Sequence, residues 1–318
     1  MTTVVTGAGL IGTAFAQNAI ARGEAVVFVD PEPRAPFLRH KLGDKGYTLV
    51  RADVRDLPTL LATIREHKAQ TVVHTAGLIG NRVQASLNAG FDINLGGTRN
   101  VGEAVRLTGV KRLVHISTFG VYDRRRDTGA PVREDFPRGG ARAYGAFKGA
   151  KEMILEAYAA AYGFEVVMLR PANVFGLGHF WSGSSGGMKM QALLQAGLEG
   201  KPARIPSSEA VPNEYIYAKD IGRAVDAAAT AKTPPQIHFN IGNGAVSPFE
   251  DVLSAIKAFC PELRYEVETV DAPLKAKGGS TMGPLDISAA KTHLGWQPEF
   301  TLPQAFEHYA AEMKAARR

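Results

Sequence analysis

Three separated segments carry the residue types that could do chemistry. Gly7-Ala-Gly-Leu-Ile-Gly12 has the spacing G-x-G-x-x-G, Thr118 follows near the middle of the chain, and Tyr144 and Lys148 stand four positions apart. The glycine spacing is typical of loops that hold a dinucleotide pyrophosphate. A hydroxyl, a phenol and an ammonium group together can orient and deprotonate an alcohol. In this order, the segments predict transfer of a hydride and a proton at a carbon that bears a hydroxyl group.

The context of the glycine motif strengthens the prediction of a dinucleotide site. The motif follows an apolar segment at 3–6 and opens a helical stretch that begins at Leu10, so backbone N–H groups and the positive helix end would bind the pyrophosphate. Asp30 ends the second apolar segment, where its carboxylate would accept hydrogen bonds from the adenosine ribose and repel a 2′-phosphate. These features predict NAD as the cofactor. Arg34 could pair with a 2′-phosphate, so NADP stays a second interpretation.

Residues after the next two predicted strands extend this site. Asp53 and Val54 follow the third strand and would lie beside the adenine, and residues 75–77 follow the fourth strand. The carboxyl ends of parallel strands meet at one edge of a sheet, which brings these residues toward the cofactor. From these residues alone, the expected cofactor contacts are Gly7, Gly9, Leu10, Ile11, Gly12, Asp30, Asp53, Val54, Thr75, Ala76 and Gly77.

Tyr144 and Lys148 would share one face of a predicted helix. An ammonium group beside the phenol, together with the positive charge of oxidised nicotinamide, would lower the pKa of Tyr144 toward neutrality. Tyr144 would then be the general base in oxidation and the general acid in reduction, while Thr118 orients the reacting oxygen. The same spacing occurs at Tyr215 and Lys219, but on a segment predicted to be extended just before a helix. We therefore assign that second pair a structural role.

Apolar strands and helical stretches alternate over the first half of the chain. The alternation predicts an α/β fold, a doubly wound parallel sheet of the Rossmann type, with a smaller C-terminal lobe for the substrate. The predicted strands lie at 3–6, 25–30, 47–52, 71–75, 112–117, 166–170 and 237–241, and the predicted helices at 10–22, 57–67, 94–107 and 144–162. We expect an NAD-binding domain of residues 1–176 with a return segment near 212–245, and a substrate lobe of residues 177–211 and 246–318.

Glycine and serine dominate the segment from Gly176 to Gly187, which predicts an irregular loop at the start of the substrate lobe. Phe180 and Trp181 in this loop could close over a substrate, and surface aromatic residues are the alternative interpretation. We include both among the candidate substrate contacts.

The overall composition excludes several classes of protein. At 318 residues with 45% hydrophobic content, the chain is too long and too apolar to be disordered. The net charge of +6 is scattered, apart from Arg124-Arg125-Arg126 and the chain end, so we expect no nucleic-acid partner. Cys260 is the single cysteine and no Cys/His cluster has zinc spacing, which favours a reducing cytoplasm and no metal site. Glycines interrupt the uncharged N-terminal stretch, so we also expect no membrane span.

Further motifs, in the same order along the chain, make it similar to the extended short-chain dehydrogenase/reductase family, the group of NAD-dependent epimerases and dehydratases. The resemblance covers nearly the whole chain. Its motifs are His74-Thr-Ala-Gly-Leu78, Asn94-Leu-Gly-Gly-Thr98, Ser117-Thr-Phe-Gly-Val-Tyr122, Tyr144-Gly-Ala-Phe-Lys148, Arg170-Pro-Ala-Asn-Val-Phe-Gly176, Asp286-Ile-Ser-Ala-Ala-Lys291 and Leu294-Gly-Trp296.

This resemblance implies the roles of several residues. It makes Thr118, Tyr144 and Lys148 the catalytic set and adds Tyr144, Lys148, Asn94 and Ala172 to the cofactor contacts. It adds Thr118 and Asn173 to the substrate contacts. It also implies a homodimer built from paired helices, here those at 95–107 and 144–162.

The chain departs from the pattern of that family at three places. The glycine motif is one residue shorter than the usual G-x-x-G-x-x-G. Phe119-Gly120 replaces the Asp-Glu pair of the 4,6-dehydratases, so we do not expect water elimination. Asn213-Glu-Tyr215 and Lys275-Ala-Lys277 stand where nucleotide-sugar enzymes carry two pyrophosphate-binding arginines, and each such contact is worth about 1.5–3 kcal/mol.

We therefore expect an NAD-dependent oxidoreductase that acts at a secondary alcohol or ketone carbon of a small polar molecule, such as a sugar, a sugar acid or a hydroxy-amino acid. The alternative is a nucleotide-sugar 4-epimerase with tightly bound NAD. A minor alternative is a non-catalytic regulator that senses NAD. Such a regulator can dispense with the tyrosine and lysine, which this chain keeps.

Overall fold

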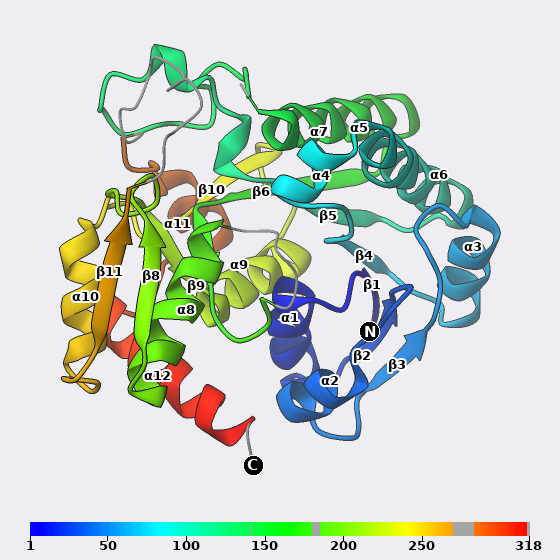
Figure 1. The fold of residues 1–318 in the computed structure, drawn as a ribbon. Helices are drawn as coiled ribbons and strands as arrows, with labels where there is room; N and C mark the ends of the chain where they lie inside the picture. Colours follow the sequence, from blue (N-terminus) through cyan, green and yellow to red (C-terminus); the bar gives the residue numbers. More distant parts are fainter. Residues whose placement is uncertain (141, 180–184, 270–282, 317–318) are drawn as a thin grey trace.

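The structure is a computed structural model that describes residues 1–140, 142–179, 185–269 and 283–316. Its centre is a seven-stranded sheet in the order β10-β6-β5-β4-β1-β2-β3, in which all neighbouring strands are parallel. The strands are β1 Thr2–Thr6, β2 Ala25–Val29, β3 Tyr47–Val50, β4 Thr71–His74, β5 Arg112–Ile116, β6 Glu165–Pro171 and β10 His238–Ile241. The predicted doubly wound parallel sheet is confirmed (Figure 1).

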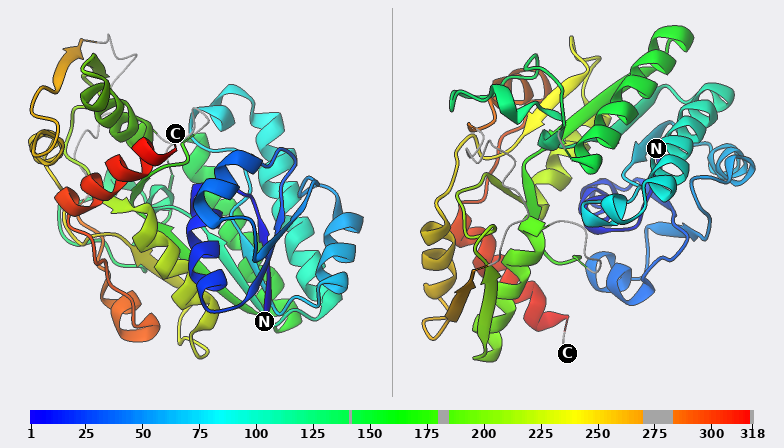
Figure 2. Two further views of the ribbon diagram at one scale, coloured as in Figure 1. Left: turned by 90° about the horizontal axis from the view of Figure 1, so that it is seen from below. Right: turned by 45° about the horizontal axis from the view of Figure 1, so that its top comes forward.

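Helices cover both faces of the sheet because successive strand residues bury opposite faces. Val4 packs in the cluster that contains helix residues of α3, α6 and α7, whereas Val5 packs with α1 and α9 (Figures 1 and 2). Around the sheet lie α1 Leu10–Ala21, α2 Ala35–Leu42, α3 Leu57–Glu66, α6 Gly97–Thr108, α7 Ala143–Tyr162, α9 Ala218–Thr230 and α11 Ser288–Leu294. The strands at the centre of the sheet therefore have buried residues on both faces.

The segment before α6 is more helical than its sequence predicts. α4 Asn81–Ala85, α5 Leu87–Ala89 and a π-helix at Gly90–Gly96 lead into α6, where a helix beginning at Asn94 was expected. Two short 3₁₀ turns, Phe119–Val121 and Arg124–Arg126, lie between β5 and α7.

A second apolar cluster lies beside the sheet, at the left of Figure 1. It is built from α8, α10 and α12, which span Ser185–Glu199, Phe249–Lys257 and Leu302–Ala315. Two small parallel pairs join it, β8 Pro202–Pro206 with β11 Arg264–Glu268, and β7 Asn173–Phe175 with β9 Tyr215–Tyr217. The division into two domains at the residues given above stays a prediction.

The loop predicted from Gly176 to Gly187 is shorter than expected, because α8 already begins at Ser185. Gly186 and Gly187 are therefore helical, and the rest of this segment from 180 to 184 lies outside the described residues. Among the described residues, no helix is both long enough and apolar enough to cross a membrane.

Candidate active site

The predicted cofactor residues meet at one edge of the sheet. β1 and β4 are neighbours although β2 follows β1 in the chain, so the chain changes direction between them. In open parallel sheets, ligands bind outside the carboxyl ends of the strands at such a switch point. The glycine loop after β1 and the segment Thr75–Gly77 after β4 lie at this point.

Each of the three positions in the loop has a glycine for a different physical reason. Gly7 has φ +96°, and a Cβ there would lie 2.5 Å from Oγ1 of Thr75, which donates to the carbonyl of Thr6 at 2.7 Å. A Cβ on Gly12 would overlap the carbonyl oxygen of Gly7. Gly9, the N-cap of α1, has no heavy atom within 4 Å of its Cβ position. Two glycines therefore permit packing, and the third leaves open space at the positive end of a helix, where a pyrophosphate fits.

The predicted acidic residues already have hydrogen-bond partners within the protein. Asp30 accepts from the backbone N–H of Ala8 at 2.8 Å, which ties the end of β2 to the glycine loop. Asp53 pairs with Arg55 through two contacts of 2.9 Å, and this guanidinium lowers the pKa of Asp53. Val54 is buried and packs against Gly97 of α6.

Asn94 and Lys151 hold the segment after β4. The Asn94 amide accepts from the N–H of Leu78 at 2.7 Å and donates to its carbonyl at 3.0 Å. The Lys151 ammonium is fully buried and donates to the carbonyl of Ala76 at 2.9 Å. A Cβ on Gly77 would lie 3.0 Å from Oδ1 of Asn94 and 3.3 Å from Nζ of Lys151. Sequence reasoning missed Lys151, although its position three residues after Lys148 on a helix was a usable signal.

The three predicted catalytic residues come together at the end of β5. Thr118 follows the strand, Tyr144 and Lys148 lie in the first two turns of α7, and the Thr118 side chain interacts with the Tyr144 hydroxyl. The Lys148 ammonium lies 5.9 Å from the centroid of the Tyr144 ring and donates to the carbonyl of Ile116 at 2.7 Å. A hydroxyl, a phenol and an amine therefore lie in one region beyond the end of β5.

The pKa of Tyr144 differs from the expectation that Lys148 would lower it. Burial raises the pKa of Tyr144 to about 12, while the hydrogen bond with Thr118 acts in the opposite direction. Burial lowers the pKa of Lys148 to about 8, partly offset by Glu152. Lys148 alone therefore does not lower the pKa of the phenol. The remaining charge that favours phenolate is the nicotinamide cation, when NAD is bound.

A buried polar network anchors α7 to the strands. Arg170 of β6 donates to Glu152 of α7 through two contacts of 3.0 and 2.8 Å, and both side chains are at most 1% exposed. Ser117 also donates to Glu152, and Arg170 donates to the Tyr122 hydroxyl at 3.0 Å. Sequence reasoning missed Glu152, although it lies four residues after Lys148 and thus on the same helix face.

Glu152, Glu156 and His238 bring ligand atoms within 4.8 Å of one another. Arginines already balance both carboxylates, since Arg170 pairs with Glu152 and Arg138 pairs with Glu156 at 2.7 Å. His238 Nε2 lies 2.9 Å from Glu156. The arrangement is an ion-pair cluster.

The predicted substrate contacts lie in two places. Ala172 is buried beside β10, and the Asn173 amide donates to the carbonyl of Glu214 at 3.0 Å. Phe180 and Trp181 lie outside the described residues.

The second tyrosine and lysine with this spacing, Tyr215 and Lys219, have separate partners. Lys189 donates to the Tyr215 hydroxyl at 2.8 Å, and Lys219 lies 2.7 Å from Nε2 of His308. Tyr215 stands on β9 and Lys219 on α9, so the two side chains do not share a helix face.

Comparison with known proteins agrees with this arrangement. The family model described as the NAD dependent epimerase/dehydratase family matches residues 3–242. The chain belongs to this family. A UDP-glucose 4-epimerase from Mycolicibacterium smegmatis is 30% identical over 96% of each chain.

Two solved structures are similar over almost the whole length. The UDP-glucose 4-epimerase of Thermus thermophilus, in complex with NAD, has a TM-score of 0.83 and 25% identity over 99% of both chains. MoeE5, in complex with UDP-glucuronic acid and NAD, has a TM-score of 0.82 and 25% identity over 99% of both chains.

Family membership confirms NAD as the cofactor and an NAD-dependent enzyme of the extended short-chain type. The residues present fit this cofactor, because Gly9 leaves space at the N-terminus of α1 and Asp30 closes the same loop. The shortened glycine motif thus still presents a helix N-terminus.

The open space at Gly9 predicts a selective effect on cofactor binding. Asp and Asn are both favoured N-caps, so Gly9→Asp and Gly9→Asn should fold with an unchanged melting temperature. We expect NAD to bind about tenfold more weakly to Gly9→Asn and about a hundredfold more weakly to Gly9→Asp, because the carboxylate adds charge repulsion. Titration calorimetry measures both constants. Unchanged NAD affinity in Gly9→Asp would contradict a pyrophosphate at this position.

The buried ammonium of Lys151 predicts a pH-dependent cost. Burial and the neighbouring Lys148 lower the pKa of Lys151 well below its usual 10.5. Below pH 10.5 the unfolded chain therefore binds a proton at this side chain more readily than the folded chain does. The stability of the folded protein falls as the pH drops below 10.5. Lys151→Met removes this cost. Relative to the wild type, Lys151→Met should therefore be more stable at about pH 7 than at about pH 9.5.

Denaturant titrations at the two pH values measure this difference. The control is Lys111→Met, at an exposed lysine, for which the difference from the wild type should not change with pH. A Lys151→Met difference that is equally independent of pH would show that the amine carries no such cost.

Proposed function

We propose that the protein is a nucleotide-sugar 4-epimerase that keeps its NAD bound through the catalytic cycle. The observation that carries the proposal is the position of Thr118 and Tyr144 together beside the cofactor edge of the sheet, in a chain 30% identical to a UDP-glucose 4-epimerase over 96% of both lengths. Of our two enzyme hypotheses, these findings favour the epimerase over the enzyme for a small free alcohol.

In the proposed reaction, the sugar C4 hydroxyl binds between Thr118 and Tyr144. Thr118 donates to the reacting oxygen and orients it, and Tyr144 takes its proton as the carbon is oxidised. When bound, NAD supplies the site that accepts the hydride and returns it. The resulting ketone must present its other face before the hydride returns, and Tyr144 then gives the proton back to the same oxygen.

Lys148 would hold the nicotinamide ribose in a fixed position relative to the phenol of Tyr144. Its ammonium is buried and fixed by the carbonyl of Ile116 at 2.7 Å, so its charge lies at a constant place beneath the Tyr144 ring. A side chain fixed in this way can hold the nicotinamide ribose in position without reorganisation during the reaction.

A second candidate is an NAD-dependent dehydrogenase for a small free alcohol, such as a sugar acid. The observation in its favour is Asn213, which stands where nucleotide-sugar enzymes of this family carry an arginine and here accepts from the Asn173 amide at 3.3 Å. Lys275 and Lys277 lie outside the described residues. Net accumulation of reduced nicotinamide with a small alcohol would favour this candidate.

The role of Tyr144 predicts a separation of chemistry from binding. Tyr144→Phe removes the proton-carrying hydroxyl and keeps the ring, so turnover should fall at least about a thousandfold, near the upper range of general acid–base catalysis. NAD affinity should stay within about twofold, because the substitution removes no charge. Kinetics and NAD titration on the same preparation measure both.

The matched control is Tyr162→Phe at the far end of the same helix, where the tyrosine is 55% exposed. It should leave turnover unchanged. If Tyr144→Phe turned over as fast as this control, the catalytic assignment would be wrong.

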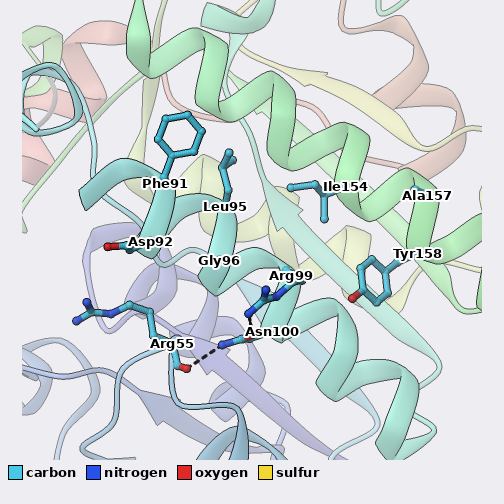
Figure 3. A pocket seen from close by; sticks show the side chains of 10 residues that line it. All are labelled: Arg55, Phe91, Asp92, Leu95, Gly96, Arg99, Asn100, Ile154, Ala157 and Tyr158. Carbon is cyan, nitrogen blue, oxygen red and sulfur yellow. Dashed lines mark hydrogen bonds between the residues drawn. The ribbon is translucent and has the colours of Figure 1, made fainter. Parts of the chain in front are cut away.

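We also propose a homodimer that pairs the α6 and α7 faces of two copies. This face exposes Phe91 at 57%, Met153 at 62% and Tyr162 at 55%. A groove of about 800 Å³ lies on it (Figure 3). Its lining is Arg55, Phe91, Asp92, Leu95, Gly96, Arg99, Asn100, Ile154, Ala157 and Tyr158. Large exposed apolar side chains rimmed by polar ones are typical of a protein interface, and a two-fold axis would bury the same patch on both copies.

This dimer predicts that a charge at its centre separates the subunits. Met153→Glu would bury a carboxylate without a partner, so we expect a monomer by light scattering where the wild type is a dimer. The control Met188→Glu changes a methionine that is 40% exposed on α8 and should leave the dimer intact. A monomeric wild type, or a dimeric Met153→Glu variant, would contradict the proposed face.

Cys260 is buried and free. A single thiol without a disulfide partner supports the proposal of a reducing, cytoplasmic location.

A further inference from the structure

Two of the three arginines at 124–126 lie close to the carboxylate of Asp123, and the third packs against an aromatic ring. Arg125 pairs with Asp123 at 2.7 Å, and Arg126 lies 3.7 Å from the same carboxylate. Arg124 makes no ion pair among the described residues. In the sequence this run is a local concentration of charge, and in the structure one of its members differs from the other two.

Arg124 lies beside the catalytic residues. Its guanidinium carbon is 5.0 Å from the centroid of the Phe119 ring, and Phe119 directly follows Thr118. A planar guanidinium over an aromatic face is held in place while its N–H groups stay available at the edge. Arg124 is therefore held against the side chain of the residue that follows Thr118.

Arg142 approaches the same region from the other end of the segment. It is the N-cap residue of α7, and Tyr144 follows two positions later. Within the described part of the chain, its side chain has no acidic partner. Residues 119–140 run along the top left of Figure 1, and α7 begins shortly after them at Ala143.

Close backbone packing holds the two ends of this segment together. A Cβ on Gly145 would overlap the carbonyl oxygen of Gly120, and a Cβ on Gly140 would lie 2.6 Å from the carbonyl carbon of Gly145. The turn after Thr118 is thus pressed against the first turn of α7. Arg124 and Arg142 flank this contact.

Arg124 and Arg142 are both exposed, and the charge of one acts on the other. Desolvation lowers the pKa of Arg124, and the charge of Arg142 lowers it further, while Asp127 acts in the opposite direction by a smaller amount. Two cations brought together without an ion-paired acid are stabilised by a bound anion. The forked donors of arginine match a carboxylate in particular.

We propose that Arg124 and Arg142 bind a carboxylate on the sugar of the substrate, which makes the substrate a nucleotide-linked uronic acid. This inference rests on the proposed function. In a hexopyranose the C6 carboxylate is attached to C5, next to the reacting C4, whereas the diphosphate is attached to C1 on the opposite side of the ring. An anion site beside Thr118 and Tyr144 therefore suits the carboxylate rather than the diphosphate.

The test compares UDP-glucuronic acid with UDP-glucose in the wild type, Arg124→Gln and Arg142→Gln. Losing one charge-assisted contact worth about 1.5–3 kcal/mol should lower kcat/KM for UDP-glucuronic acid by about 10-fold to 150-fold. The value for UDP-glucose should stay within about twofold. Arg124→Lys keeps the charge but loses the fork, so its loss should be intermediate.

Arg125→Gln is the matched control, because this arginine lies in the same turn and already pairs with Asp123. It should leave the preference between the two sugars unchanged. An equal loss for both sugars in Arg124→Gln, or the same loss in Arg125→Gln, would overturn the proposal. Melting temperatures equal to that of the wild type show that each variant is folded.

Calorimetric titrations separate this proposal from its alternatives. UDP alone should bind equally to the wild type and to Arg124→Gln; a weaker affinity in the variant would assign the arginines to the diphosphate and overturn the carboxylate site. If the wild type interconverts neither sugar yet binds UDP-glucuronic acid more tightly than UDP-glucose through Arg124, the epimerase proposal fails and the carboxylate site stands.

Discussion

The buried ion pair between Glu152 and Arg170 sets the geometry on which the site depends. An unpaired charge in the interior costs several kcal/mol, so α7 can pack on the sheet only where Glu152 meets the guanidinium on β6. Tyr144 and Lys148 precede Glu152 by eight and four positions and share its helix face. The pair therefore fixes the height of the phenol above the end of β5.

The ion pair between Glu152 and Arg170 also fixes the position of Thr118, the residue that faces the phenol. Ser117 donates to Glu152 and directly precedes Thr118, and Tyr122 accepts from Arg170 at the far end of the turn. The turn that carries Thr118 is thus held at both ends by one cluster. Catalytic groups placed on a strand end and a helix with such support stay close to a productive arrangement. The segment that carries the two arginines begins just beyond this turn.

Local features of the chain could be predicted from its sequence, whereas partners distant in the sequence could not. The glycine loop and the strands were predictable because their signals are glycine spacing and apolar runs. The chain position of Lys151 was visible, but its burial against Ala76 depends on how α7 packs. The expected lowering of the Tyr144 pKa assumed an ammonium beside the phenol, but Lys148 donates to Ile116 instead. The early start of α8 was missed because its first residues are serine and glycine, which are weak helix formers.

The central claim is that one hydride leaves and returns to the same carbon within one active site. Incubation of the purified protein with C4-deuterated UDP-glucuronic acid or UDP-glucose, without added cofactor, tests this claim most directly. We predict that the C4 epimer forms with its deuterium retained at C4 and that no reduced nicotinamide accumulates. Absence of the epimer, together with accumulation of reduced nicotinamide when NAD and a small free alcohol are supplied, would contradict the account and identify a dehydrogenase.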